Sequence, residues 1–416
     1  MTVSTDRDPT SFDPAVNARV IEMIRTGAVA LAVLLSGFVQ REPAPYELFL
    51  VVLIPVWALF GLRISRNIAP LLVLLILFNV GGMIAMSQMA DLATAPMYIA
   101  VSLFLAFTSI FFAAIIEAQP RILTIIFRTW VLTAVVTATL GILGYFDAFP
   151  GADIFTRYNR AAGAFKDPNV FGPYLVLPGL FLLHRIMTAE ARTALFAVPP
   201  LFMIILGIFL SFSRGAWGLF VFSAAVMTLA LLIHNQRGII RLRILLMCLA
   251  AVVVVIVGLI IAWQIPAIAS LLEQRGQLVQ DYDGARLGRF ARHLLGFEVA
   301  LEHPFGIGPL AFGQIYGQDT HNIWLKALLD YSWLGFAAYF TLIIWTIAGS
   351  FRILFRVREW QPFLLCTFAA FIGHIGLGTV IDTDHWRHLY LIIGMLWGMM
   401  ALEQRHQASL RSTTDQ

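Results

Sequence analysis

Long runs of apolar residues recur from one end of this chain to the other, and few folds can accommodate them. Of the 416 residues, 59% are hydrophobic and only 12% are charged, whereas a soluble domain carries about 25% charged residues. The runs are continuous and do not alternate as the strands of a membrane barrel do. The sequence therefore predicts an all-α, polytopic membrane protein.

About twelve of these runs are candidates for membrane-crossing helices, because roughly 20 apolar residues span the hydrocarbon core. They cover roughly residues 21–39, 46–62, 68–88, 96–117, 121–145, 170–187, 193–211, 214–233, 241–264, 322–350, 362–381 and 386–402. The tenth run is too long for one perpendicular helix, so we expect a tilt or an extramembrane turn within it. Because no internal repeat is visible, we expect a single transmembrane domain over residues 20–402, between cytoplasmic tails at 1–19 and 403–416.

Composition excludes several other classes of protein and site. The net charge of +4 is small and spread out, which leaves no basic footprint for nucleic acid. Cys248 and Cys366 both lie inside apolar runs, so neither a disulfide framework nor a zinc site is expected. The polar residues 1–19 do not resemble a signal peptide.

Basic residues in the connections indicate how the chain is oriented. More than half of the 28 lysines and arginines fall on the side of the N-terminus, so the positive-inside rule predicts that both termini are cytoplasmic. The odd-numbered connections then face outward, and they hold the unusual polar clusters. Clusters on one side indicate a reaction site, whereas clusters on opposite sides would indicate a transport path.

The longest interruption of the apolar pattern is the outward connection at residues 265–321. Within it, Arg286, Arg289 and His293 are spaced so that they share one face of a helix. The apolar side of that helix is formed by Leu287, Phe290, Leu294, Phe297 and Leu301. We expect this helix to lie in the membrane surface, where its basic stripe binds either a ligand or lipid phosphates.

A second cluster runs from Arg160 to Asn169 and precedes the sixth apolar run. Asp167 or Asn169 is expected to cap the following helix, with Pro168 in its first turn. The free N–H groups at a helix start attract anions, and Arg160 and Lys166 add positive charge. The alternative is a capped helix whose basic residues lie among the lipid headgroups.

A third cluster, from Ser211 to Gly215, makes a tight turn between the seventh and eighth runs. Ser213 is the expected cap of the eighth helix, and Arg214 then lies in its first turn near the hydrocarbon edge. An arginine at this depth is unfavourable unless it is paired or faces a polar cavity. The alternative is an arginine that extends toward the headgroups.

His321 ends the outward connection. Asp319 or Thr320 is expected to cap the helix that begins near Asn322, and the positive end of that helix favours a neutral imidazole. A neutral imidazole can accept the proton of an attacking hydroxyl. The alternative is a histidine that only caps the helix or contacts water.

The segment from Asp382 to His388 lies between the last two runs. Two carboxylates and a histidine in a short loop are only a weak indication of a metal site. We therefore expect a salt-bridged turn here, with Trp386 at the level of the headgroups.

Outward arginines beside a neutral histidine suit one kind of chemistry. Arginines can hold a diphosphate and stabilise the charge that it gains as a leaving group. The histidine can deprotonate an acceptor hydroxyl. Because nucleotide sugars are cytoplasmic, an outward enzyme of this kind needs a donor that is carried on a lipid diphosphate.

In order and spacing, these motifs resemble the O-antigen ligase and polymerase family of bacterial membrane glycosyltransferases, over about residues 150–350. The matching motifs are Arg160-Ala-Ala-Gly-Ala-Phe-Lys-Asp-Pro-Asn169, Ser211-Phe-Ser-Arg-Gly215, the Arg286/Arg289 helix with His303-Pro-Phe-Gly-Ile-Gly308, and Thr320-His-Asn322 before Leu334-Gly335. The closing motif Asp384-His-Trp-Arg-His388 resembles the branch associated with exopolysaccharide production.

The resemblance implies a twelve-span glycosyltransferase of the lipid-phosphate-sugar type, with no nucleotide-binding domain, no cofactor and no metal. Its donor would be an undecaprenyl-diphosphate-linked glycan, and His321 would be the general base. Direct attack of the acceptor hydroxyl would invert the anomeric centre. Arg160, Arg214 and Arg289 would hold the diphosphate, and the full set of predicted substrate-binding residues is Arg160, Arg214, Arg286, Arg289, Lys166 and Asn169.

The resemblance also places the chain in the bacterial inner membrane, with its active site facing the periplasm. Three acceptors stay open: lipid A-core for a ligase, another lipid-linked repeat for a polymerase, and protein for an O-oligosaccharyltransferase. Membrane lipids and polysaccharide-assembly proteins are further expected partners. Rival interpretations are a flippase or transporter of lipid-linked glycans, and an accessory subunit that only binds. Against a transporter, four midspan stretches hold no charged residue, namely residues 71–78, 101–107, 221–233 and 251–261.

Overall fold

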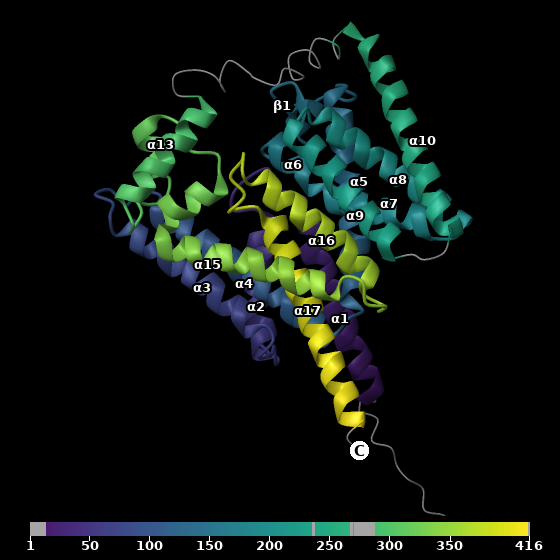
Figure 1. Ribbon diagram of the computed structural model, residues 1–416, viewed down its shortest axis with the longest axis horizontal. Coiled ribbons are helices and arrows are strands. Elements are labelled where there is room, and N and C mark those ends of the chain that lie inside the picture. The colour runs from purple at the N-terminus through teal and green to yellow at the C-terminus, as the bar shows by residue number, and fades with distance from the viewer. Residues whose placement is uncertain (1–13, 235–237, 267–268, 270–287, 415–416) are drawn as a thin grey trace, which may run out of the picture.

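The computed structural model describes residues 14–234, 238–266, 269 and 288–414, and helices dominate it (Figure 1). Within these ranges, eight helices are long and apolar enough to cross a membrane, and two shorter apolar helices accompany them. The chain is therefore an all-α, polytopic membrane protein, as the sequence predicts.

Each predicted run coincides largely with a helix or a pair of helices. The first half contains α1 (Pro14–Leu35), α2 (Pro45–Leu59), α3 (Ala69–Met86), α4 (Ala95–Ala118), α5 (Ile122–Tyr145), η1 (Ala152–Phe155), β1 (Thr156–Arg157), β2 (Arg160–Ala161), α6 (Pro168–Tyr174) and α7 (Val176–Thr188). The second half contains α8 (Ala191–Leu210), α9 (Arg214–His234), α10 (Gly238–Trp263), α13 (Arg289–Glu302), α14 (Ala311–Tyr316), α15 (Ile323–Ile353), α16 (Gln361–Leu377) and α17 (Arg387–Thr414). The sixth run is divided after Tyr174, because Pro178 has no N–H to donate to the Tyr174 carbonyl and its ring crowds that carbonyl.

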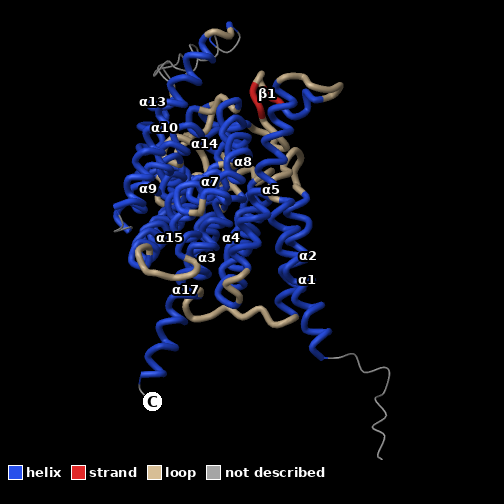
Figure 2. Tube along the Cα trace, turned by 90° about the vertical axis from the view of Figure 1, so that its right-hand side faces the viewer, coloured by secondary structure: helices blue, strands red, loops and turns tan. Residues whose placement is uncertain are grey.

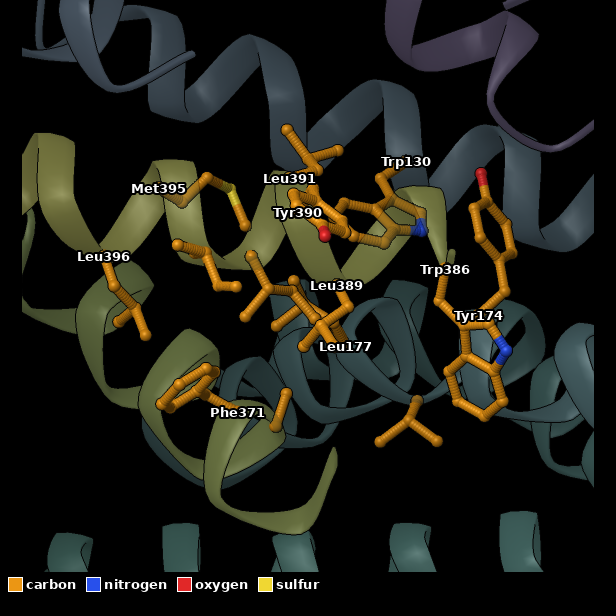
Figure 3. Packing of buried hydrophobic residues seen from close by; sticks show 14 of the residues in the cluster. Trp130, Tyr174, Leu177, Phe371, Trp386, Leu389, Tyr390, Leu391, Met395 and Leu396 are labelled. Atoms are coloured by element: carbon orange, nitrogen blue, oxygen red, sulfur yellow. The ribbon is translucent and has the colours of Figure 1, made fainter. Parts of the chain in front are cut away.

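The helices form two groups that meet at α16. In one group α15 packs along α3, and α17 packs along α4; in the other, α7 and α8 pack with α5 and α9 (Figure 1). α16 contacts α7 and α9 on one side and α17 on the other. Figure 3 shows part of the buried core at this junction, where Trp130 of α5, Tyr174 of α6, Phe371 of α16 and Leu389 of α17 belong to one cluster.

Close approach of backbones holds the central helix pairs together. A Cβ atom on Gly81 of α3 would lie 2.1 Å from the carbonyl oxygen of Tyr331 in α15. A Cβ atom on Gly394 of α17 would lie 2.5 Å from the carbonyl oxygen of Ser109 in α4. Lipid tails give little hydrophobic drive for association between helices, so membrane helices rely on such tight contacts through small residues.

The tenth predicted run contains a kink. α15 is interrupted at Ser332, where φ is 63° and ψ is 173°. The outward connection satisfies the backbone there: the Ile307 N–H donates to the Leu329 carbonyl at 2.8 Å, and the Trp333 N–H donates to the Pro304 carbonyl at 3.1 Å. The run is thus too long for one straight helix, as expected, but a kink inside the helix takes the place of a turn outside it.

The start of α1 and the end of α17 lie at the same end of the bundle, and β1 lies at the opposite end (Figure 2). This arrangement is the one expected if both termini are on one side of the membrane. α17 continues to Thr414, so the predicted tail at residues 403–416 begins inside a helix.

Candidate functional site

A single cavity brings together polar residues from four separate parts of the chain. Its volume is about 640 Å³, and its wall comes from the segment around the start of α6, the start of α9, His321 before α15, and the connection between α16 and α17. The polar and charged residues of the wall are Arg160, Asp167, Asn169, Ser213, Arg214, His321 and Asp382. Four predicted site residues are therefore neighbours in space: Arg160, Asn169, Arg214 and His321.

A short β-hairpin carries Arg160 to the cavity. β1 (Thr156–Arg157) pairs with β2 (Arg160–Ala161) in antiparallel register. The two residues between the strands, Tyr158 and Asn159, have φ values of 55° and 54°, and two left-handed residues are typical of the tightest hairpin turns. The turn fixes the position of Arg160 at the start of β2, and the side chain of Arg160 is buried.

Hydrogen bonds from Arg160 join two of the sequence clusters. Its Nε donates to the carbonyl oxygen of Ser211 at 2.6 Å, and its Nη2 donates to Oδ1 of Asn169 at 2.8 Å. A planar guanidinium group can hold acceptors in two directions at once, which an ammonium group does with far less geometric control. Arg160 thereby fixes the start of α6 against the turn before α9.

Asp167 provides the N-cap of α6. Its Oδ1 accepts the N–H of Asn169 at 2.8 Å, and Pro168 occupies the first turn. Of the two caps that the sequence allows, the structure therefore selects Asp167. The side chain of Asn169 is left to bind Arg160 and to line the cavity.

Lys166 does not line the cavity. Its side chain is exposed, and its backbone N–H donates to the carbonyl of Val39 at 3.0 Å. Its carbonyl accepts from the guanidinium group of Arg157 at 2.9 Å. Because these bonds turn the residue toward the end of α1, the geometry gives no support to a role for Lys166 in substrate binding.

Arg214 is the first residue of α9. The turn before it places Phe212 at a φ of 45°, and the Oγ of Ser213 accepts the N–H of Ala216 at 3.4 Å, as expected for a cap. Arg214 is partly buried and lines the cavity. The positive end of the α9 dipole adds to the charge of Arg214, and together they favour an anionic ligand.

His321 precedes α15 in a constrained backbone conformation. Its φ of 50° lies in the left-handed region, which is disfavoured for a residue with a Cβ atom. The next residue, Asn322, is the N-cap: its Oδ1 accepts the N–H groups of Trp324 and Leu325 at 2.9 and 3.2 Å. The cap fixes the chain immediately after His321.

The expectation that Asp319 or Thr320 caps α15 is wrong. The carboxylate of Asp319 binds the ammonium group of Lys326 instead, and Asn322 takes the capping position. An ion pair with a buried lysine is stronger than a hydrogen bond from a backbone N–H, so it wins the competition for the carboxylate. His321 is therefore held next to the helix start without being its cap.

The carboxylate of Asp382 lies beside the imidazole of His321. Its Oδ2 is 3.2 Å from Nδ1, and the two side chains are 22% and 40% exposed. A carboxylate only accepts hydrogen bonds, so Nδ1 carries the hydrogen, and Nε2 of the neutral ring remains an acceptor. The pair combines a proton acceptor with a group that orients it and stabilises the imidazolium formed.

Asp382 is a site residue that sequence reasoning missed, because the whole segment to His388 was expected to be structural. That expectation holds for Asp384, which accepts from His385 Nδ1 at 2.8 Å, and for Arg387, which binds Glu47 at the start of α2. In the sequence, the only feature that draws attention to Asp382 is a second aspartate two residues away. Nothing in the sequence said which of the two carboxylates faces the cavity.

Asp384 and His385 fasten the connection that carries Asp382. Burial alone would raise the pKa of Asp384, but the His385 imidazole and the Lys326 ammonium group hold that pKa well below its ordinary value. Burial alone would lower the pKa of His385, and Asp384 outweighs burial and raises it. Each residue therefore favours the charged form of the other.

Only part of the predicted basic stripe falls within the described residues. Arg286 lies outside the described residues, as does the side chain of Arg289, the first residue of α13. Arg292 is buried and donates to the side-chain oxygen of Gln318, so α13 is attached to the segment that leads to His321. Its apolar side is exposed, as expected for a helix in the membrane surface, through Phe290, Leu294, Phe297 and Leu301.

The wall of the cavity is suited to binding an anion and accepting a proton. Two guanidinium groups and an amide offer donors to phosphate oxygens, and the His321–Asp382 pair offers the acceptor for a proton. In the part of the chain that the structure describes, no group of three or more His, Cys, Asp and Glu side chains is placed to hold a metal ion. Metal independence remains a prediction.

A comparison with known families supports the resemblance seen in the sequence. Residues 199–340, about a third of the chain, match the family described as O-antigen ligase. The matched segment contains Arg214, Arg289 and His321, and it supports glycan transfer of the ligase or polymerase type. Arg160 and Asp382 lie outside it and reach the cavity through the fold. No curated protein matches the chain.

Proposed function

We propose that this membrane protein, with its O-antigen ligase segment at residues 199–340, transfers a glycan from undecaprenyl diphosphate to an acceptor hydroxyl. The reaction takes place on the periplasmic side of the bacterial inner membrane, in the assembly of O-antigen or exopolysaccharide. The family match supports the reaction class. The residues around the cavity support the site.

The diphosphate of the donor binds to the arginines of the cavity. Arg160 and Arg214 provide guanidinium groups, and Arg289 at the start of α13 is the third candidate. As the bond between the anomeric carbon and the phosphate oxygen breaks, the leaving diphosphate gains negative charge. Fixed guanidinium groups that face the leaving diphosphate stabilise the transition state more than the ground state, which lowers the barrier.

His321 activates the acceptor. Its Nε2 takes the proton of the acceptor hydroxyl while the hydroxyl oxygen bonds to the anomeric carbon from the face opposite the diphosphate. The configuration at that carbon is inverted, and the carrier leaves as undecaprenyl diphosphate. Asp382 holds the imidazole by Nδ1–H and stabilises the imidazolium.

The observation that carries this proposal is the His321–Asp382 pair in the same cavity as two arginines. A site that only binds a lipid phosphate needs cations but no proton acceptor. A site that only moves a lipid across the bilayer needs neither an oriented base nor a carboxylate that stabilises the protonated base. Glycosyl transfer to a hydroxyl needs all of these groups together.

The purified protein, reconstituted without any ion gradient, is expected to release undecaprenyl diphosphate from a lipid-linked glycan donor. Two acceptors are supplied in separate reactions, lipid A-core and a second lipid-linked repeat, and the one that is extended distinguishes a ligase from a polymerase. Product is measured by a gel shift of the glycan. If labelled donor crosses the vesicle membrane while the carrier bond stays intact, the protein is a flippase and the proposal is wrong.

Replacing Asp382 with asparagine is expected to lower kcat about 10- to 100-fold and to change KM for the donor little. Asparagine has nearly the same shape, but it cannot stabilise the imidazolium, and its NH₂ group favours the wrong tautomer of His321. Initial rates in the transfer assay give both constants. Asp153→Asn removes an exposed carboxylate outside the cavity wall and is the matched control, for which no change is expected.

A further inference from the structure

A buried cluster of charges lies directly behind the proposed site. Lys326, in the first turn of α15, has a side chain that is 3% exposed. Its Nζ is 2.5 Å from Oδ2 of Asp319 and 3.2 Å from Oδ2 of Asp330. Charges inside a membrane helix are unfavourable and are usually retained for a function. The mechanism above does not use Lys326, so its presence needs an explanation.

Asp319 connects this cluster to His321, two residues further along the chain. While Oδ2 binds Lys326, Oδ1 of Asp319 accepts the N–H of Thr320 at 3.0 Å, and Thr320 is fully buried. Asp319 thus fixes the Asp319–Thr320 peptide, one residue before His321, and the Asn322 cap fixes the first turn of α15 directly after it. A left-handed residue with a Cβ atom persists only where its surroundings hold it.

The cluster also lies next to the segment that supplies Asp382. Nζ of Lys326 lies 5.5 Å from the centre of the Tyr98 ring, and the Tyr98 hydroxyl donates to the carboxylate of Asp384, which also binds His385. Each half of the His321–Asp382 pair is therefore two residues from a carboxylate that is anchored at this buried cluster.

Stability of α15 alone does not account for this arrangement. Asp330, four residues after Lys326 on the same helix and fully buried, already pairs with the lysine within the helix. The additional bond to Asp319 reaches a residue outside the helix. What it does is attach the otherwise irregular segment at residues 317–322 to the start of α15.

We propose that Lys326 is a positioning residue of the transfer site: by holding Asp319, it fixes the backbone of His321 so that the imidazole meets Asp382. This inference rests on the proposed function, because its consequence is the alignment of the general base. Lys326 touches no substrate and acts only through Asp319. Small displacements of a reacting group cost rate steeply, about 100-fold for roughly 1 Å.

The test compares Asp319→Ala with the unmodified full-length protein in the reconstituted transfer assay. Lys326 keeps its pairing with Asp330, so thermal unfolding in detergent is expected at nearly the same temperature. kcat is expected to fall about 10- to 100-fold with KM for the donor unchanged. Asp319→Glu retains the carboxylate and is expected to recover most of the loss. The exposed Asp153→Ala serves as the matched control.

A second variant removes the Lys326–Asp319 ion pair by replacing the lysine. Lys326→Met combined with Asp330→Asn deletes one charge of each sign, so the net charge of the buried cluster is preserved. The expected result is again a lower kcat at constant KM in a protein that still unfolds cooperatively. If either variant is folded and retains the kcat of the unmodified protein, Lys326 has no positioning role and the inference is wrong.

One further arm separates this inference from the proposed function. His321→Ala is measured in the same assay. If it retains full activity, His321 is not the base, and the proposed function and the inference fail together. If it is inactive while Asp319→Ala is fully active, only the positioning role of Lys326 is excluded.

Discussion

Replacing His321 with alanine is expected to lower kcat for glycan transfer about 1,000-fold and to leave donor affinity nearly unchanged. Loss of a general base costs roughly 10²- to 10⁴-fold, and the imidazole has no part in holding the diphosphate. The substitution is also expected to be mild for the fold. Asn322, not His321, caps α15, and the imidazole is 40% exposed.

The matched control is His303→Ala. His303 is an exposed histidine of the same outward connection and lies outside the cavity wall, so transfer is expected to be unchanged. The measurements are kcat in the reconstituted assay and the length distribution of surface glycan in cells that carry each variant. Normal glycan assembly by a stable His321→Ala protein would falsify the general-base role.

The membrane-crossing helices could be predicted from the sequence because each depends on properties of its own segment. Whether a stretch such as residues 96–117 crosses the bilayer depends mainly on its own length and apolarity, and α4 covers it almost fully (Ala95–Ala118). For the kink at Ser332, the sequence indicates only that the tenth apolar run is too long for one straight helix. Its position depends on the Ile307–Leu329 hydrogen bond, which joins two distant segments and leaves no local pattern.

The site was only partly predictable for the same reason. Arg214 and His321 stand out because each is a polar residue at the end of an apolar run, where its unfavourable position needs a reason. Arg160 stands out because it adds positive charge near the start of a helix. Asp382 was missed because its partner, His321, lies 61 positions away in the sequence. Only the packing of α16 against its neighbours brings the two together.

Contacts were hard to predict where one polar group had two possible partners. Asp319 can cap a helix or pair with a cation, and the outcome depended on Lys326 being buried beside it. Lys166 can face an anion or the solvent, and in the structure its side chain is exposed and lies outside the cavity wall. Sequence spacing names the candidates for such contacts, but burial determines which contact forms.

Replacing Arg214 with alanine is expected to lower kcat/KM for the donor about 100-fold. Arg214 combines its own charge with the positive end of α9 at the wall of the cavity, and a fixed donor that stabilises a developing anion contributes about 10²- to 10³-fold. Because the charge on the diphosphate exists before transfer and grows during it, KM is expected to rise and kcat to fall. This pattern differs from that of His321→Ala, where kcat alone changes.

Arg214→Lys separates charge from geometry. A lysine keeps the charge but loses the planar fork that binds two phosphate oxygens together, so an intermediate loss of about 10-fold is expected. Arg41→Ala is the matched control, because Arg41 is exposed and lies outside the cavity wall. If Arg214→Ala and Arg41→Ala give the same kcat/KM as the unmodified protein, the diphosphate is not bound at the start of α9. The donor would then have to be held by Arg160 and α13 alone, and the cavity would need a different assignment.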